Sequence, residues 1–86
     1  MDTIQYFYPE EKLLFRFQVR PITEVRELAG VKYRYNWALY YAIGNGRFKK
    51  GMAYHKKKRA LEQFKKPRKN AMRILAERMA LSYFRV

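Results

Sequence analysis

The segment from Arg47 to Lys69 constrains this chain most, because about half of its positions are Lys or Arg and Glu62 is its single acid. Positive side chains at this density repel one another. The repulsion is tolerated when a polyanion is nearby, because each Lys or Arg that neutralises a phosphate releases condensed counterions. The segment therefore indicates what the protein touches and says little about any reaction.

The charge is divided unequally along the chain. Residues 1–46 contain six Lys or Arg and five Asp or Glu, a net charge of +1, whereas residues 47–86 contain fourteen and two, a net charge of +12. Such an asymmetry is typical of a contact with nucleic acid or an anionic membrane, and a cationic half can also dock on an acidic protein. We therefore describe residues 1–86 as a single small domain with a near-neutral, aromatic-rich half and a strongly basic half.

The length allows one domain with a small core, since a chain of this size buries only about 60 to 65% of the surface that its unfolded form exposes. Aromatic residues make up 17% of the sequence, which argues against a disordered tail. Cysteine is absent, so there is no disulfide framework and no Cys-based zinc site. The sequence contains neither a secretory signal nor an apolar run of membrane-spanning length, and we expect an intracellular location, cytoplasmic or mitochondrial.

Two extended segments are predicted near the N-terminus. The aromatic run at residues 6–8 precedes Pro9, which restricts its neighbour to extended geometry. Apolar and polar side chains alternate from Leu13 to Arg20, and a two-residue period is typical of a half-buried strand. A single strand needs a partner for its backbone, which could be residues 5–8, residues 32–35 or another chain.

Two helices are predicted in the middle of the chain. Thr23 is a suitable N-cap and Gly30 a suitable C-terminal stop for a helix of about two turns. Residues 33–43 place three aromatic side chains four residues apart and end at a Gly-Asn-Gly turn, which favours a second helix. The first part of this segment also alternates, so a strand remains an alternative for residues 31–35.

Two further helices are predicted in the basic half. Residues 52–64 combine a thin apolar seam with many cations, and Pro67 ends that helix. Residues 70–84 repeat apolar side chains at spacings of three and four, which indicates an amphipathic helix with Met72, Leu75, Met79 and Tyr83 in its core stripe. The predicted fold class is therefore mainly α: three to four short helices with an extended or strand-like N-terminal arm, completed by partner chains.

The cations of the basic helix and its flanking turns are the candidate nucleic-acid-binding residues. They would form a ridge about 20 Å long that could follow one nucleic-acid backbone. Phe48, Tyr54 and His55 lie among them and could stack on bases or pack against the protein, and this mixture favours RNA. The alternative is a solvated helix face, which normally interleaves acids. The candidates are Arg47, Lys49, Lys50, Tyr54, Lys56, Lys57, Lys58, Arg59, Lys65, Lys66, Arg68 and Lys69.

The aromatic residues of the near-neutral half are candidates for a protein interface, because Tyr and Trp offer a large contact area with a polar tip. The alternative is that they form the core of a chain that is poor in aliphatic residues. The candidates are Tyr6, Phe7, Tyr8, Phe15, Phe17, Trp37, Tyr40 and Tyr41.

No catalytic constellation is recognised in the sequence. His55 is the single histidine and has no second ligand for a metal, and Ser82 has no histidine and acid to activate it. The neighbouring acids Glu10 and Glu11 are expected to diverge, so they do not form an acid–base couple. We therefore expect no enzymatic activity, no metal, no cofactor and no small-molecule substrate.

One local resemblance concerns Phe15 to Arg20 and, after a short gap, the run Tyr33-Arg34-Tyr35-Asn36-Trp37-Ala38-Leu39. This pair of segments resembles the N-terminal part of transposon-encoded proteins related to compact RNA-guided nucleases, in which a strand precedes an aromatic-Tyr-Asn-Trp-Ala-Leu helix. The resemblance covers less than a third of the chain and does not extend to the carboxylate-bearing nuclease domain. It is compatible with contact to nucleic acid and transfers no role to an individual residue.

These patterns together predict a non-catalytic basic subunit of a larger assembly that binds RNA phosphates and other protein subunits, as ribosomal or mitochondrial ribosomal proteins do. The alternative is an accessory subunit of a membrane complex of the mitochondrial respiratory type, whose basic half faces acidic lipid or an acidic subunit. A small DNA-binding regulator is a third possibility. Pro67 and the lysine-rich tip disfavour it, because recognition helices usually begin with base-reading Asn, Gln or Arg.

Overall fold

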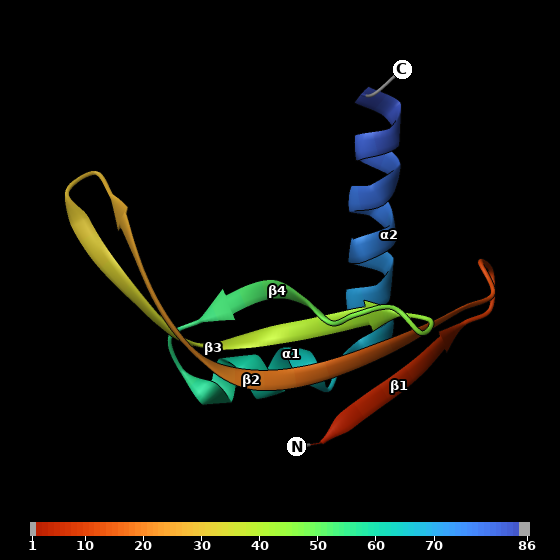
Figure 1. Ribbon diagram of the computed structural model, residues 1–86, viewed down its shortest axis with the longest axis horizontal. Coiled ribbons are helices and arrows are strands. Elements are labelled where there is room, and N and C mark those ends of the chain that lie inside the picture. The colour runs from red at the N-terminus through yellow and green to blue at the C-terminus, as the bar shows by residue number, and fades with distance from the viewer. Residues whose placement is uncertain (1, 85–86) are drawn as a thin grey trace.

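The computed structural model describes residues 2–84, with side chains described for residues 2–80. Four strands precede two helices (Figure 1), in the order β1 (Thr3–Tyr8), β2 (Leu13–Leu28), β3 (Val31–Ile43), β4 (Lys49–Tyr54), α1 (Lys57–Phe64) and α2 (Pro67–Phe84). The strands form one antiparallel sheet in the order β1-β2-β3-β4. The fold is therefore mainly β, and the predicted mainly-α class is wrong.

Strand β2 contains the strand predicted over residues 13–20 and continues to Leu28. It pairs with β1 on one side and β3 on the other. Residues 5–8 are confirmed as a partner of the predicted strand, whereas its second partner is residues 38–43 and not residues 32–35, which pair with residues 24–27. Pro21 lies inside this long strand. Pro21 is tolerated there because it has a neighbouring strand on one side only: pairing with β1 reaches no further than Gln18. On the other side the β2–β3 register shifts after Pro21, so its missing N–H falls at an irregular point of the ladder.

The helix predicted between Thr23 and Gly30 is not formed. These residues belong to β2 and to the tip of a β2–β3 hairpin that projects from the body of the protein (Figure 1). Leu28 pairs with Val31, and the two residues between them, Ala29 and Gly30, have φ angles of 52° and 80°. Positive φ at both central positions is the mark of the tight turn that matches strand twist.

The helix predicted over residues 33–43 is also wrong, because this segment is β3. It is flanked by strands on both sides, with Phe17 of β2 opposite Tyr41 and Tyr54 of β4 opposite Trp37. Cross-strand pairs of aromatic residues stabilise a sheet, and aromatic residues are enriched in strands. The predicted turn after Ile43 is confirmed, with Gly44 at a φ of 59°.

The helix predicted over residues 52–64 divides into two elements. Met52 and Ala53 lie in β4, and the helix begins only at Lys57. Pro67 follows the end of α1 and is the first residue of α2. The N–H of a first helical residue has no partner within the helix, so its absence in proline costs no helical hydrogen bond. The predicted helix over residues 70–84 is confirmed as part of α2.

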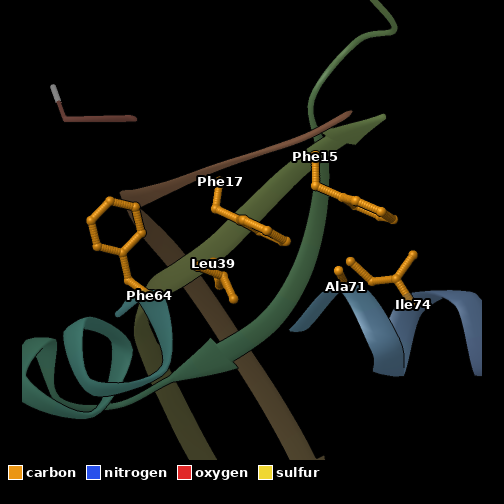
Figure 2. Close-up of a cluster of buried hydrophobic side chains, with 6 residues drawn as sticks. All are labelled: Phe15, Phe17, Leu39, Phe64, Ala71 and Ile74. Carbon is orange, nitrogen blue, oxygen red and sulfur yellow. The ribbon is translucent and has the colours of Figure 1, made fainter. Parts of the chain in front are cut away.

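Both helices cover the same face of the sheet and close the core there (Figure 2). Phe15 and Phe17 of β2 and Leu39 of β3 meet Phe64 of α1 and, at the other end, Ala71 and Ile74 of α2. Burial of such side chains supplies most of the stability of a small domain.

The inward face of α2 matches the predicted stripe only at Leu75, which packs against the core. Met72 and Met79 are 48% and 72% exposed, while Ala71 and Ile74 are buried. The side chain of Tyr83, predicted in the same stripe, lies outside the described residues. Only the first turns of α2 meet the sheet, and its second half extends beyond the strands (Figure 1).

Candidate nucleic-acid interface

The eleven predicted cations between Arg47 and Lys69 are all exposed, but they do not form one helical ridge. Helix α1 has eight residues and is therefore about 12 Å long. The cations form three groups, at the β3–β4 turn and β4, at the start of α1, and at the α1–α2 turn. The groups are Arg47, Lys49 and Lys50; Lys56, Lys57, Lys58 and Arg59; and Lys65, Lys66, Arg68 and Lys69. Tyr54, predicted with them, is half-buried and packs against the core.

Carboxylates neutralise few of these cations. Among the described side chains, the ion pairs are those of Glu24, with Arg26 at 2.7 Å and with Lys50 at 2.5 Å. Hydrogen bonds from Arg26 and Lys50 lower the pKa of Glu24 below its ordinary value, and Glu24 in turn raises the pKa of Arg26. Within residues 47–69, Lys50 is thus the one cation with a carboxylate partner in the described part of the chain.

A basic groove separates β4 and the β3–β4 turn from α2, and we call it the α2–β4 groove. A pocket of about 420 Å³ is lined by Tyr41, Ala42, Ile43, Gly46, Arg47, Lys49 and Arg78. A second pocket of about 260 Å³ is lined by Tyr41, Lys50, Gly51, Met52, Arg73, Ile74 and Glu77. Tyr41 lines both pockets, so they adjoin. Five cations and one acid therefore surround this groove.

Sequence reasoning missed Arg73 and Arg78 as candidate binding residues. They follow the cationic segment in the sequence, and Arg73 reads as half of a helical pair with Glu77. No sequence pattern links them to Arg47 or Lys49. They join those residues because α2 passes the sheet next to the β3–β4 turn.

The helix-free face of the sheet carries a second cluster, which we call the arginine–aromatic ladder: Arg16, Phe48, Arg20 and Tyr40. The guanidinium carbons of Arg16 and Arg20 lie 5.0 and 4.9 Å from the centre of the Phe48 ring, and Arg20 lies 4.6 Å from the centre of the Tyr40 ring. At these distances the ring faces attract the positive charges.

The ladder is also tied to the backbone. Arg16 donates hydrogen bonds from Nε and Nη2 to the carbonyl oxygens of Gly44 and Gly46, at 3.2 and 2.8 Å. Ala42, opposite Arg16, and Ala38, opposite Arg20, are almost fully buried although no helix covers this face. Phe48 and Tyr40 are therefore already stacked on arginines of the protein itself.

The structure separates the eight aromatic candidates for a partner interface. Phe15 and Phe17 are fully buried in the core and expose no surface to a partner. Lys57 Nζ lies 4.9 Å above the half-buried ring of Trp37, and Phe7 is 55% exposed. The rest are half-buried: Tyr40 belongs to the ladder, and those that pack against the core are Tyr6, Tyr8 and Tyr41.

A further apolar surface lies on the projecting β2–β3 hairpin, where sequence reasoning had expected a helix. Leu28, Val31 and Tyr33 share one face of the hairpin and Val25 lies on the other, and these four side chains are 45% to 70% exposed. Clustered exposed apolar residues of this kind mark contact surfaces more often than isolated ones do.

His55 has a structural contact, since its Nδ1 lies 3.1 Å from the carbonyl oxygen of Arg34. Within the described residues, no group of three or more His, Asp or Glu side chains is placed to hold a metal ion. No helix in the same part of the chain is both long enough and apolar enough to cross a membrane.

Comparison with protein-family models, with curated proteins and with solved structures finds no match to this chain. The local resemblance to transposon-encoded proteins therefore gains no support from these comparisons. Its aromatic-Tyr-Asn-Trp-Ala-Leu segment is a strand here, where that family has a helix.

Proposed function

We propose that this protein is a non-catalytic RNA-binding subunit of a larger assembly. The observation that carries the proposal is the exposure of the eleven cations of residues 47–69, of which Lys50 alone has a carboxylate partner among the described residues. Unpaired surface charge of one sign destabilises a compact fold through self-repulsion. A polyanion relieves that repulsion, and counterion release adds to the affinity.

The distribution of the cations favours a folded RNA over a straight duplex. The three groups lie on a strand edge, at a helix start and at an interhelical turn, so that they reach phosphates at separated points. Contacts of this kind recognise shape and backbone, which is how proteins usually recognise structured RNA. The sheet and the two packed helices hold the groups at fixed spacing.

The apolar residues of the hairpin and the exposed Phe7 support the second part of the proposal, that the protein works within an assembly. A domain this small gains stability when neighbouring subunits cover such residues. The hairpin extends away from the basic surface of α1, so protein and RNA contacts can form at the same time (Figure 1).

Binding across a salt series tests the proposal. The parent protein is titrated with a structured RNA, a DNA duplex and cardiolipin-containing vesicles. A variant with Lys58→Gln and Arg59→Gln removes two exposed cations of α1, and a matched control with Lys32→Gln and Arg34→Gln removes one Lys and one Arg from the hairpin. RNA is expected to bind most tightly, and the slope of log affinity against log salt is expected to become shallower by about 1.4 to 1.8 in the α1 variant alone.

The other outcomes point elsewhere. Tighter binding to vesicles than to RNA supports the accessory subunit of a membrane complex, and tighter binding to the DNA duplex supports a regulator. An equal loss in both variants means that net charge alone attracts the RNA and that α1 is not part of an interface.

A further inference from the structure

We infer that the α2–β4 groove binds the sugar–phosphate backbone of single-stranded RNA, with Tyr41 as the residue on which a base stacks. The inference rests on the RNA-binding function proposed above and gives that function a site and a form of RNA. It concerns two residues, Arg73 and Arg78, that lie outside the cationic segment of the sequence.

The charges of the groove come from both walls. Arg47 and Lys49 line the first pocket from the strand side, and Arg78 lines it from α2. A phosphate in this pocket therefore meets cations on two sides, and an arginine can grip it with two parallel hydrogen bonds. Within the described residues, none of these three side chains has a hydrogen bond or an ion pair.

The second pocket continues the same path. Arg73 lines it together with Lys50, whose ammonium group is paired with Glu24, and Glu77 is the acid among the lining residues. Successive phosphates of one strand could therefore pass from the β3–β4 turn towards Met52 with cations beside each. Such an electrostatic channel for one backbone is the common feature of proteins that bind single strands.

The size of the groove selects a single strand. Pockets of about 420 and 260 Å³ have volumes close to those of small-ligand sites, and such volumes are too small to enclose a double helix. A duplex could touch only the rim of the groove. A single strand can enter, and its unpaired bases are free to stack on an aromatic ring.

Tyr41 is placed for that stacking because it lines both pockets at the point where they join. Its ring is half-buried and packs against the core, and the ring lies beside Gly51, where an added Cβ atom would be 3.5 Å from Tyr41 Cδ1. Tyr40 and Phe48, by contrast, already stack on arginines of the ladder. Stacking on one tyrosine tolerates any base, so we expect little sequence preference.

The test compares two variants of equal charge. Lys49→Gln with Arg78→Gln removes one Lys and one Arg from the groove, and Lys32→Gln with Arg34→Gln removes one of each from the hairpin; all four side chains are exposed. Each protein is titrated with a fluorescent single-stranded RNA of mixed sequence and with its fully paired duplex. For the single strand, the salt slope of the groove variant is expected to be shallower by about 1.4, and that of the hairpin variant to equal the parent's.

A second measurement does not depend on a variant. Ultraviolet crosslinking of the parent protein to the single strand, followed by peptide mass spectrometry, is expected to place the adduct on Tyr41. If the thermal transition of the groove variant differs from that of the parent, so that its fold is altered, the crosslink on the parent protein decides whether RNA binds in the groove.

The outcomes separate the groove from the function. If the parent binds neither form of RNA, the RNA-binding function falls and the inference with it. If the parent binds RNA and Lys58→Gln with Arg59→Gln weakens it, while the groove variant behaves like the hairpin variant, the function stands and the groove is not the site. Tighter binding to the duplex than to the single strand, or a crosslink on residues away from the groove, also overturns the inference.

Discussion

Replacing Phe48 with Leu tests whether the arginine–aromatic ladder stabilises the helix-free face of the sheet. The half-buried ring of Phe48 receives two guanidinium groups, those of Arg16 and Arg20, at 5.0 and 4.9 Å. A cation–π contact near the surface contributes about 0.5–1 kcal/mol, so the two contribute about 1–2 kcal/mol. Leucine keeps most of the apolar volume but has no π face. We therefore expect Phe48→Leu to lower the free energy of unfolding by about 1–2 kcal/mol.

Phe48→Ala removes the apolar volume as well, and we expect a loss of about 2–4 kcal/mol for this half-buried position. Phe7→Leu is the matched control, because Phe7 is 55% exposed and has no cation over its ring among the described residues. A surface substitution of this kind changes the stability by less than about 0.5 kcal/mol.

Urea unfolding measures all three variants, with the fluorescence of Trp37, the single tryptophan, as the signal. The midpoint is expected to fall for Phe48→Leu and further for Phe48→Ala, with an unchanged dependence on urea concentration. For a domain of this size, a loss of 1–2 kcal/mol corresponds to a fall in melting temperature of about 4–16 °C. Where the variants remain folded, their affinity for RNA is expected to equal the parent's.

Two results would refute this reasoning. If Phe48→Leu is as stable as Phe7→Leu, the contacts between the guanidinium groups and the ring contribute nothing. If Phe48→Leu is fully folded and binds RNA much more weakly, Phe48 stacks on bases and the ladder is part of the binding surface.

Three further predictions concern a turn, an ion pair and the junction between the helices. Ala29→Asn is expected to stabilise the protein by about 1 kcal/mol, because Ala29 has a φ of 52° and Asn tolerates this left-handed conformation; a melting temperature that stays level or falls contradicts it. Two cations lower the pKa of Glu24 from its ordinary 4.5, so its ion pairs stabilise the fold above that pH and are lost as the pH falls through the lowered pKa. Glu24→Gln should therefore lower the melting temperature at neutral pH and leave it unchanged in strong acid. A difference in melting temperature that does not depend on pH would contradict a role of the ion pairs. Asn70 is 2% exposed and donates a hydrogen bond from Nδ2 to the Gln63 carbonyl oxygen at 2.6 Å. In chemical denaturation, Asn70→Ala is expected to lower the free energy of unfolding by about 1–3 kcal/mol, and Asn70→Asp by more, since a carboxylate cannot donate. Equal losses in the two variants would contradict the role of this hydrogen bond.

The predicted helix at residues 33–43 was wrong for a definable reason. Tyr33, Trp37 and Tyr41 are four residues apart, and a spacing of four places side chains on one face of a strand as well as on one face of a helix. The odd-numbered residue Leu39 is buried between the half-buried Trp37 and Tyr41, which fits a period of two. Strand pairing on both sides decides between the periods, and the partners of β3 come from other segments.

The hairpin illustrates the same difficulty over a shorter range. Thr23 and Gly30 have the residue types of helix caps, yet Gly30 serves in a tight turn with Ala29. A helix of two turns is marginal without tertiary support, whereas pairing with residues 31–35 extends an existing sheet. Local capping signals could not reveal that competition.

The candidate site was predicted in part. Sequence reasoning identified the cations from Arg47 to Lys69, and all of them are exposed. It did not identify Arg73 and Arg78 or the role of Arg16 and Arg20 beside Phe48. Those groupings join residues about thirty positions apart, and no periodic pattern records such a distance.

The sequence by itself determined the properties that depend on neighbouring residues. These are the charge of the basic half, the alternating strand at residues 13–20, the turn at Gly44 and the helix at residues 70–84. Only the tertiary structure decided that residues 23–43 form strands, and that Lys49 and Arg78 share one groove. The physical reason is that sheet pairing and helix packing are stabilised by contacts with residues distant in the chain, whereas charge and periodicity depend only on residues that are neighbours in the sequence.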